Sequence, residues 1–337
     1  MENIRFAQDM NIVKIMAAEA RRESVDSDKL QEAHNTIVEL AQYPSPDHKF
    51  AIGQLIGFTI NEIDRDAGNN WEDNVAHLVT CNFGETPQFI ARLEGIRAVV
   101  QAKGATTPRS KIANKTVTLD TVAVSAEPVI NIVEMQNGRV NMADLINDAH
   151  YQMKLAELGY YQKTLLSYGR NFKKPYYGYG NGFDPVVVDP MIRHWMKLSR
   201  GALPSILGSI DIIHKIIRQT GFTGTNGNTQ FNNEIIGAYH QTGIIGNYAG
   251  ANVVNLMNPV VDGTDEFVLN DKIAFVLPNF ADKTMRPLKI VKEGTVQAQD
   301  YTDIDDKSYV VRLDQYIGAG VVYGDRPYMS IYEDKSN

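Results

Sequence analysis

The stretch GIRAVVQAKGATTPRSKIANKTVTL, Gly95 to Leu119, decides the fold class of this chain. It carries five basic residues and no acidic one, although the whole chain has a formal net charge of −7. Apolar runs flank a polar tip that contains Gly104 and Pro108, and this order predicts a long β-hairpin with a loose end. A lone hairpin of that length is not stable in water. The sequence therefore predicts that the hairpin lies on another surface.

The basic charge of this hairpin has three candidate uses. An ordinary solvated hairpin would carry the charges incidentally, and DNA could be bound through its phosphates. Against DNA, no aromatic residue on which a base could stack occurs between Phe89 and Tyr151. An acidic neighbouring subunit is the better match, because opposite charges guide docking. The candidate inter-subunit contact residues are Arg97, Lys103, Arg109, Lys111 and Lys115.

A long helix follows the hairpin, in NMADLINDAHYQMKLAELGYYQKTLLSYG, Asn141 to Gly169. Asn141 is a suitable N-cap, and Asp144 lies in the first turn, where the helix dipole favours an acid. Apolar residues recur on one face of this segment. At ~1.5 Å per residue the helix would be about 40 Å long. The pattern predicts one long helix beside a sheet.

The C-terminal stretch DQYIGAGVVYGDRPYMSIYED, Asp314 to Asp334, predicts two strands. Apolar residues alternate from Tyr309 to Tyr323, which indicates a strand with one buried face. A shorter strand is expected from Tyr328 to Tyr332, after a turn. The glycines do not fit a dinucleotide fingerprint, because Gly324 comes one position late and Pro327 leaves no room for the helix that would hold a phosphate. We therefore expect Gly318 and Gly320 to serve close packing within a sheet.

The remaining segments predict an N-terminal arm and a second subdomain. Residues 4–42 have a helical pattern with a break near 24–27, and we expect a mobile or partner-dependent arm. KKPYYGYGNGFD, residues 173–184, predicts a linker. Beyond it, amphipathic helices are predicted for PMIRHWMKLS (190–199) and LPSILGSIDIIHKIIRQ (203–219), followed by short alternating helices and strands. This order is typical of an α+β subdomain.

The composition is that of an ordinary globular protein. The chain has 337 residues, of which 43% are hydrophobic and 22% are charged, and this length favours two subdomains. One cysteine, Cys81, cannot form an intramolecular disulfide, which fits a reducing compartment. The charged N-terminus has no signal-peptide core, and no uninterrupted apolar stretch is long enough to span a membrane. We therefore expect a protein made in the cytoplasm with no membrane partner.

No residue pattern predicts catalysis, a cofactor or a metal site. The seven histidines include no H-x-x-x-H pair, and a single cysteine cannot build a zinc cluster. No G-x-S-x-G nucleophile elbow occurs. Asp303, Asp305 and Asp306 form a carboxylate cluster that we interpret as a solvated turn. The sequence therefore favours a structural role, with no catalytic, cofactor-binding or metal-binding residue.

The order of these elements resembles the major capsid proteins of tailed bacteriophages, which share the Hong Kong ninety-seven phage fold. FIARLEGIRAVVQAKG at the start of the hairpin, the long helix segment and VVRLDQYIGAGVVYGDRP near the end carry the resemblance. It implies an α+β fold with an N-terminal arm, an extended hairpin loop, a peripheral domain with a long spine helix and sheet, and an axial domain. The implied boundaries are 1–85 for the arm and lead-in, 86–118 for the extended loop, 119–175 with the return strand 307–334 for the peripheral domain, and 176–306 for the axial domain.

The resemblance also implies a function. Members self-assemble into hexamers and pentamers of an icosahedral shell that encloses double-stranded DNA without sequence-specific contacts. The implied partners are the chain itself and portal, scaffolding or decoration proteins. The implied location is the virion, assembled in the host bacterial cytoplasm. An encapsulin-type compartment shell is the alternative within this fold, and a soluble nucleotide- or nucleic-acid-binding protein is the alternative from another class.

Overall fold

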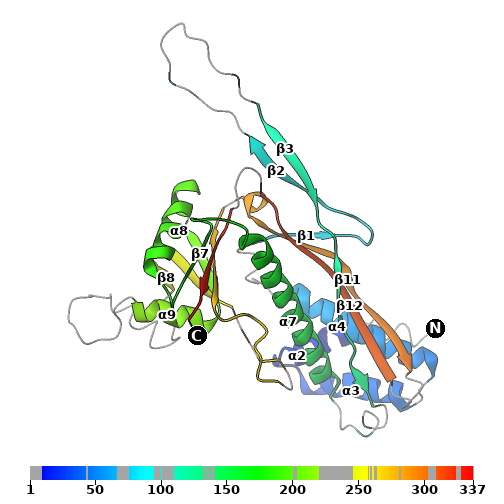
Figure 1. Cartoon of the computed structure of the whole chain (residues 1–337). Coiled ribbons are helices and arrows are strands. Elements are labelled where there is room, and N and C mark those ends of the chain that lie inside the picture. The colour runs from blue at the N-terminus through cyan, green and yellow to red at the C-terminus, as the bar shows by residue number, and fades with distance from the viewer. Residues whose placement is uncertain are drawn as a thin grey trace.

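The computed structural model of the chain contains two sheets, a layer of helices and a projecting hairpin (Figure 1). The structure describes residues 10–42, 45–66, 76–94, 100, 109, 111–131, 134, 137, 141–199, 203–219, 246–256, 258, 260–261, 264–280, 282–302, 309–323 and 328–336. None of the helices in these ranges is long and apolar enough to cross a membrane.

The first sheet is built around two long strands. β11 (Leu288–Thr302) and β12 (Tyr309–Val321) pair antiparallel along their whole length, with one irregularity between Glu293 and Gln297. The other strands are β1 (His77–Cys81) beside β11, and β4 (Val122–Ala126) and β5 (Val129–Ile130) beside β12. Val311, Leu313 and Ile317 are fully buried, which confirms the strand predicted from their alternation.

The predicted long helix is confirmed as α7 (Met142–Gly169). The side chain of Asn141 accepts a hydrogen bond from the Ala143 amide at 2.9 Å, and Asp144 lies in the first turn. The helix packs on β12 and β4 over most of its length and on β13 near its end. A Cβ at Gly169 would overlap the Ile331 side chain, so glycine allows the helix to end against the second sheet.

The N-terminal segment forms three packed helices, α2 (Met10–Ala20), α3 (Ser27–Gln42) and α4 (Pro46–Asp66). The predicted break is confirmed, because no helix covers residues 21–26. The expectation of a mobile arm for residues 4–42 is wrong for the described residues 10–42. Val13, Met16 and Ile56 are buried in the same core as α7 and β12, because each helix carries an apolar face long enough to pack.

α4 covers the edge of β11 with polar side chains. The Asn61 amide group donates to Val296 O at 3.2 Å and accepts from Val296 N at 2.8 Å, as a neighbouring strand would. Gln54 donates to Ala298 O at 3.3 Å. A Cβ at Gly57 would lie 3.0 Å from the Cβ of Ala298, so the helix approaches the strand closely. This contact satisfies an edge that would otherwise be open to pairing with another chain.

Ion pairs join α4 and β11 to α7. Asp64 of α4 contacts His150 at 2.9 Å and Lys154 at 3.0 Å. Burial opposes ionisation of Asp64, but these two partners outweigh it and hold its pKa well below the usual range. Glu157, which is 1% exposed, lies 3.4 Å from Lys154 and 3.7 Å from Lys292 of β11. The network connects the N-terminal helices, the long helix and the first sheet.

The second sheet has six strands and its own helices. The order is β6 (Tyr177–Gly180), β13 (Ser330–Asp334), β10 (Ile273–Pro278), β7 (Pro204–Gly208), β9 (Ala251–Asn255) and β8 (Asn247–Tyr248). α8 (Pro185–Leu198) and α9 (Ile210–Gln219) pack against it around Phe183, Trp195 and Ile206. This confirms a second α+β unit.

Three details predicted for this unit are wrong. The predicted linker contains β6, because Gly178 and Gly180 let that strand lie against α8; a Cβ at Gly178 would overlap Val187 and Met191. α8 begins at Pro185, after an Asp184 N-cap, and not at Pro190. The helix predicted for 203–219 is split into β7 and α9. All five residues of β7 are buried, and a run buried on both faces lacks the alternation that marks a strand.

The C-terminal segment connects the two sheets. β12 belongs to the first sheet, and β13, which confirms the predicted second strand, belongs to the second sheet. The turn predicted at Gly324 lies outside the described residues. A Cβ at Gly318 would lie 2.8 Å from Asp120 O, which confirms that this glycine serves close packing. The predicted return strand 307–334 is therefore divided between both sheets.

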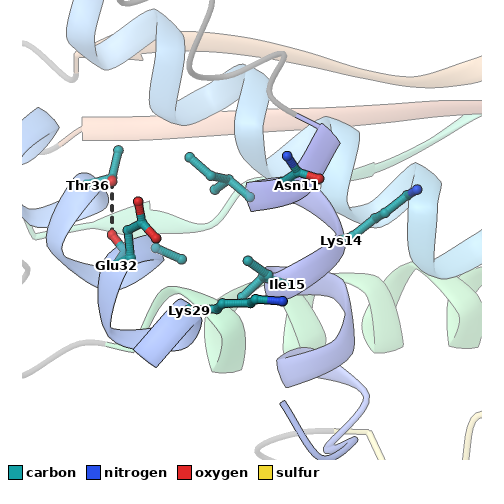
Figure 2. Close-up of a pocket in the computed structure, with 8 residues that line it drawn as sticks. Asn11, Lys14, Ile15, Lys29, Glu32 and Thr36 are labelled. Carbon is teal, nitrogen blue, oxygen red and sulfur yellow. Dashed lines mark hydrogen bonds between the residues drawn. The ribbon is translucent and has the colours of Figure 1, made fainter. Parts of the chain in front are cut away.

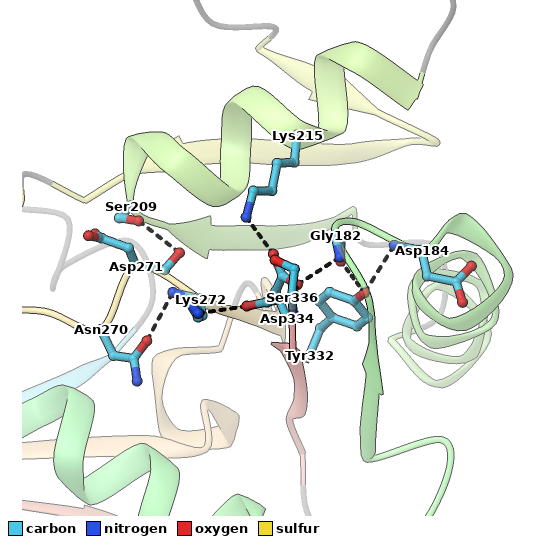
Figure 3. A network of polar contacts seen from close by, with 10 residues as sticks. All are labelled: Gly182, Asp184, Ser209, Lys215, Asn270, Asp271, Lys272, Tyr332, Asp334 and Ser336. Carbon is cyan, nitrogen blue, oxygen red and sulfur yellow. Dashed lines mark hydrogen bonds and ion pairs between the residues drawn. The ribbon is translucent and has the colours of Figure 1, made fainter.

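A polar clasp fixes the end of the chain (Figure 3). The Asp334 carboxylate accepts hydrogen bonds from Gly182 N at 2.7 Å, Ser336 N at 2.8 Å and Lys215 Nζ at 2.5 Å. Tyr332 donates to Gly182 O and accepts from Asp184 N. Burial opposes ionisation of Asp334, but these donors outweigh it and lower its pKa from 3.8 to about 2. The amide at the glycine turn thus binds a carboxylate of its own chain.

We expect Asp334→Asn to lower the free energy of unfolding at pH 7 by about 1–2 kcal/mol, because a depressed carboxyl pKa stabilises the folded state. The contribution should be present above about pH 4 and lost as the pH falls toward 2. Denaturant titration of the unassembled chain between pH 7 and pH 3 measures both effects. Asp265→Asn, at an exposed site, is the matched control. Equal stability of the Asp334 variant and the unmodified chain at pH 7 would refute the expectation.

Candidate subunit interface

The predicted hairpin is present and projects from the body of the molecule (Figure 1). β2 (Gln88–Glu94) and β3 (Ala113–Thr118) pair antiparallel, with Phe89 opposite Val117 and Ala91 opposite Lys115. β2 ends before Gly95, and β3 falls within the predicted hairpin, whose residues 95–99, 101–108 and 110 lie outside the described residues.

One face of the hairpin root is anchored in the body. Phe89 and Ala91 are each 4% exposed, and they pack with Leu119, Val291 and Val322. A Cβ at Gly320 would overlap the Leu119 side chain, so that glycine makes room for the anchor. Ile90, which points to the opposite face of β2, is 67% exposed. The root is therefore fixed on one face only.

The hairpin presents exposed cations. Arg109, Lys111 and Lys115 are exposed, and within the described part of the chain none of them contacts a carboxylate. Apolar side chains accompany them, since Ile112 is 55% exposed and Val100 is fully exposed. Arg97 and Lys103, the other predicted contact residues, lie outside the described residues. The structure thus places three of the five predicted cations on a surface where no described carboxylate of the same chain contacts them.

An acidic groove lies at the start of α7. It has a volume of 490 Å³ and runs between the end of β4 and the first turns of the helix. Its carboxylates are Glu127, Asp144 and Asp148. Asp144 and Asp148 are exposed at i and i+4, a spacing at which like charges repel. Glu127 contacts Arg312 at 3.7 Å, whereas no cation of the described chain contacts either aspartate.

Sequence reasoning did not identify this groove. The fold brings Glu127 next to a helix that begins 15 positions later, and no local pattern predicts that contact. The i, i+4 spacing of Asp144 and Asp148 was the available signal. Because two like charges at this spacing repel each other, a cation from outside the chain would stabilise this surface.

A second groove lies between α2 and α3 (Figure 2). It has a volume of 480 Å³, with Ile12 and Ile15 among its apolar lining. Lys14, Lys29 and Glu32 are at its rim. Because this rim carries both signs of charge, it matches a strongly charged partner less well than the acidic groove does.

Three of the described histidines, His34, His150 and His194, serve packing or ion pairs. His34 contacts Glu19 at 2.8 Å, and His150 contacts Asp64. His194 packs edge-on against Tyr176 and Trp195. In the ranges that the structure describes, no three His, Cys, Asp or Glu residues are grouped as a metal site would require.

A model of the protein family described as "SPbeta prophage-derived putative capsid protein YonB" matches residues 3–332. No curated protein sequence matches the chain. Among solved structures, Mycobacterium phage Che8 matches with 13% identity and a TM-score of 0.51, covering 75% of this chain and 86% of that chain. Mycobacterium phage Cain matches with 10% identity and a TM-score of 0.51 over 77% of this chain and 89% of that chain.

The mature capsid of bacteriophage PhiM1 gives a similar result. Its chain is 11% identical, with a TM-score of 0.50, and the match covers 79% of this chain and 87% of that chain. At such identities the likeness shows a shared fold.

The anchored and free faces of the hairpin root predict opposite mutational effects. We expect Phe89→Ala to lower the free energy of unfolding by about 3 kcal/mol, because it leaves a cavity in a buried cluster. Ile90→Ala, one position along the same strand, should change it by less than about 0.5 kcal/mol. Denaturant titration of the unassembled chain measures both variants. Similar effects at the two positions would show that the root is not anchored by one face.

Proposed function

The chain belongs to the YonB family of prophage-derived capsid proteins, and from this premise we propose that it forms hexamers and pentamers of an icosahedral shell around double-stranded DNA. The protein is a structural component of a virion capsid and not an enzyme. Its α+β fold matches a phage mature capsid chain, and a capsid protein associates with further copies of itself. The proposal concerns the composition of the rings, the symmetry of the shell and the DNA that the shell encloses.

The sheets support a proposed division into domains. We assign the first sheet with α7 to the peripheral domain, and the second sheet with α8 and α9 to the axial domain. The β2–β3 hairpin is the extended loop, and α2 to α4 are the N-terminal arm. This assignment moves β11 out of the predicted axial range 176–306, because β11 pairs with β12 along its whole length.

The observation that carries the proposal is a pair of complementary surfaces on one chain. Among the described residues, neither Arg109, Lys111 and Lys115 of the hairpin nor Asp144 and Asp148 of the acidic groove contact a group of opposite charge. We propose that the hairpin of one copy lies over the acidic groove of its neighbour. Each exposed ion pair is worth only about 0–1 kcal/mol. Repetition around a ring adds these small terms together.

The remaining proposed partners follow from the capsid role. Portal, scaffolding or decoration proteins would contact the shell. Packaged DNA would meet a chain with a net charge of −7, which favours weak contacts without sequence specificity.

We expect the purified chain to form closed shells in electron micrographs, because the hairpin cations and the acidic groove complement each other between copies. Shells formed in cells that carry the phage genome should hold nuclease-protected DNA. Enzyme cargo in place of DNA would indicate a compartment shell. A monodisperse monomer that binds nucleic acid, at every salt and protein concentration, would overturn the proposed function.

Charge reversal tests the proposed contact. We expect Arg109→Glu, Lys111→Glu and Lys115→Glu together to abolish shells while the melting temperature of the unassembled chain stays nearly unchanged, because all three side chains are exposed. Asp144→Lys with Asp148→Lys should also abolish shells. Combining both sets should restore assembly, since the charges are then exchanged. Light scattering and electron microscopy measure the result.

Two controls accompany the charge reversal. Lys163→Glu changes an exposed lysine of α7 outside the groove and should leave shells intact. Added salt should weaken assembly of the unmodified chain, because it screens exposed pairs. Normal assembly of the triple variant would show that the hairpin charge is incidental. Unfolding of the triple variant would place the hairpin in the core.

A further inference from the structure

A cavity of 540 Å³ lies beneath the hairpin root, and we call it the root cavity. Its walls come from β2, β3, the start of β11, and a 3-10 turn, η1 (Lys283–Met285). The residues that matter chemically are His77, Asp282 and Lys289. It therefore joins the projecting hairpin to the first sheet.

Lys289 is a buried cation with no ion-pair partner in the described part of the chain. The residue is 2% exposed, and its Nζ donates to Thr284 O at 2.6 Å and lies 6.0 Å from the centre of the Phe89 ring. No carboxylate in the described chain forms an ion pair with it. Burial lowers the pKa of Lys289 from 10.5 to about 8. Keeping such a group charged costs free energy until an anion approaches.

Asp282 lines the cavity and its charge favours the protonated form of Lys289, but it forms no ion pair with that amine. The Asp282 carboxylate caps η1, accepting from Thr284 N at 2.9 Å and Thr284 Oγ1 at 2.7 Å. His77 Nδ1 is buried and has no hydrogen-bond partner. Burial and the charge of Lys289 lower the pKa of His77. The cavity is thus lined by an ammonium group that has no ion-pair partner and by a histidine whose buried Nδ1 has no hydrogen-bond partner.

Two of the lining residues are apolar and exposed to solvent. Ile90 is 67% exposed and Met285 is 48% exposed, and both line the cavity. A docked polypeptide would cover them, while a small inorganic ion would not. An ammonium group beside exposed apolar residues therefore fits a segment that carries one acidic side chain.

We propose that the root cavity binds an aspartate or glutamate side chain of a neighbouring copy of this chain, whose carboxylate contacts Lys289 and His77. The proposal rests on the proposed function, since it requires neighbouring copies. The chain supplies such groups in excess, with 40 acidic and 33 basic residues. The cavity lies at the root of the element that projects toward neighbours. This site is distinct from the hairpin cations and from the acidic groove.

The contact makes assembly depend on pH. A docked carboxylate raises the pKa of Lys289 above its value in the free chain, so binding favours the protonated amine. The contribution is complete below about pH 8 and is lost as the pH rises through the higher, bound value. The other charged and titratable groups around the cavity are His77, Asp282, Lys283 and Arg286. Among these, Asp282 competes with an incoming carboxylate for Lys289.

Substitutions of opposite effect test the site. We expect Lys289→Met to raise or preserve the melting temperature of the unassembled chain, because it removes an uncompensated charge, and to weaken assembly at pH 7 at least tenfold. The loss of assembly between pH 7.5 and 9.5 should also become smaller. Asp282→Asn, which keeps the cap, should strengthen assembly several-fold. Lys163→Met, at an exposed site, is the control for the loss of one lysine and should change neither property.

A carbodiimide identifies the partner group directly, because it joins an amine to a carboxylate in contact with it. Shells are assembled from a mixture of isotope-labelled and unlabelled chains, cross-linked and analysed by mass spectrometry. A mixed-isotope peptide pair that joins Lys289 to an aspartate or glutamate supports the proposal. A pair only within one copy, or no pair at Lys289, overturns it.

A separate measurement does not depend on shells. Addition of N-acetylglutamate amide to the unassembled chain should shift the NMR signals of His77 and Lys289, and the shift should be absent in Lys289→Met. An equal response to inorganic phosphate would indicate a general anion site and overturn the preference for a carboxylate. No response to either, with normal pH-dependent assembly of Lys289→Met, overturns the site while the proposed function stands. If the probe binds but the unmodified chain forms no shells, the proposed function is overturned and the anion site stands.

Discussion

The antiparallel pairing of β11 with β12 is the interaction on which the other elements depend. It runs from the Leu288–Val321 pair to the Thr302–Tyr309 pair, and each other layer uses one part of it. One face is buried beneath α7 and α4, and the hairpin root packs on the other face at Val291. α4 covers the edge of β11, and β12 leads toward the second sheet. A loss of this pairing would remove the support of both the helices and the hairpin.

The two outer edges of the first sheet are treated differently. On one side β1 pairs with the start of β11, and farther along β11 the Asn61 side chain supplies both hydrogen bonds that a neighbouring strand would make with Val296. In the described part of the chain, β4 pairs with β12 only, and Val122 is 42% exposed there. The acidic groove begins where β4 ends, at Ala126. The covered part of β11 cannot pair with a strand of another chain, which suits a chain that must associate with copies of itself in a defined orientation.

The parts that the sequence predicted are those in which one local pattern decides the structure. The alternation in β12 and the cap of α7 are examples, because burial of one face and a terminal hydrogen bond leave periodic or positional marks. β7 was missed because both of its faces are buried. The hairpin cations could be predicted because basic residues are concentrated in one stretch of sequence. The acidic groove could not be predicted, because it forms only when the fold places Glu127 beside α7. Lys289 was missed because its burial follows from sheet packing, and a lysine next to apolar strand residues gives no sign of it.

Shell assembly requires that free subunits remain folded and that contacts favour the associated state. Exposed ion pairs of the hairpin add little each, so misplaced subunits can dissociate before the ring closes. A buried ammonium such as Lys289 acts differently, because its cost is present in the free chain and is offset only when a carboxylate enters the cavity. The difference in free energy of the contact between the free and the assembled subunit determines how far it shifts the assembly equilibrium. Groups that are poorly compensated in the free subunit are therefore effective drivers of association, provided that the long β11–β12 pairing and the helices above it keep that subunit folded.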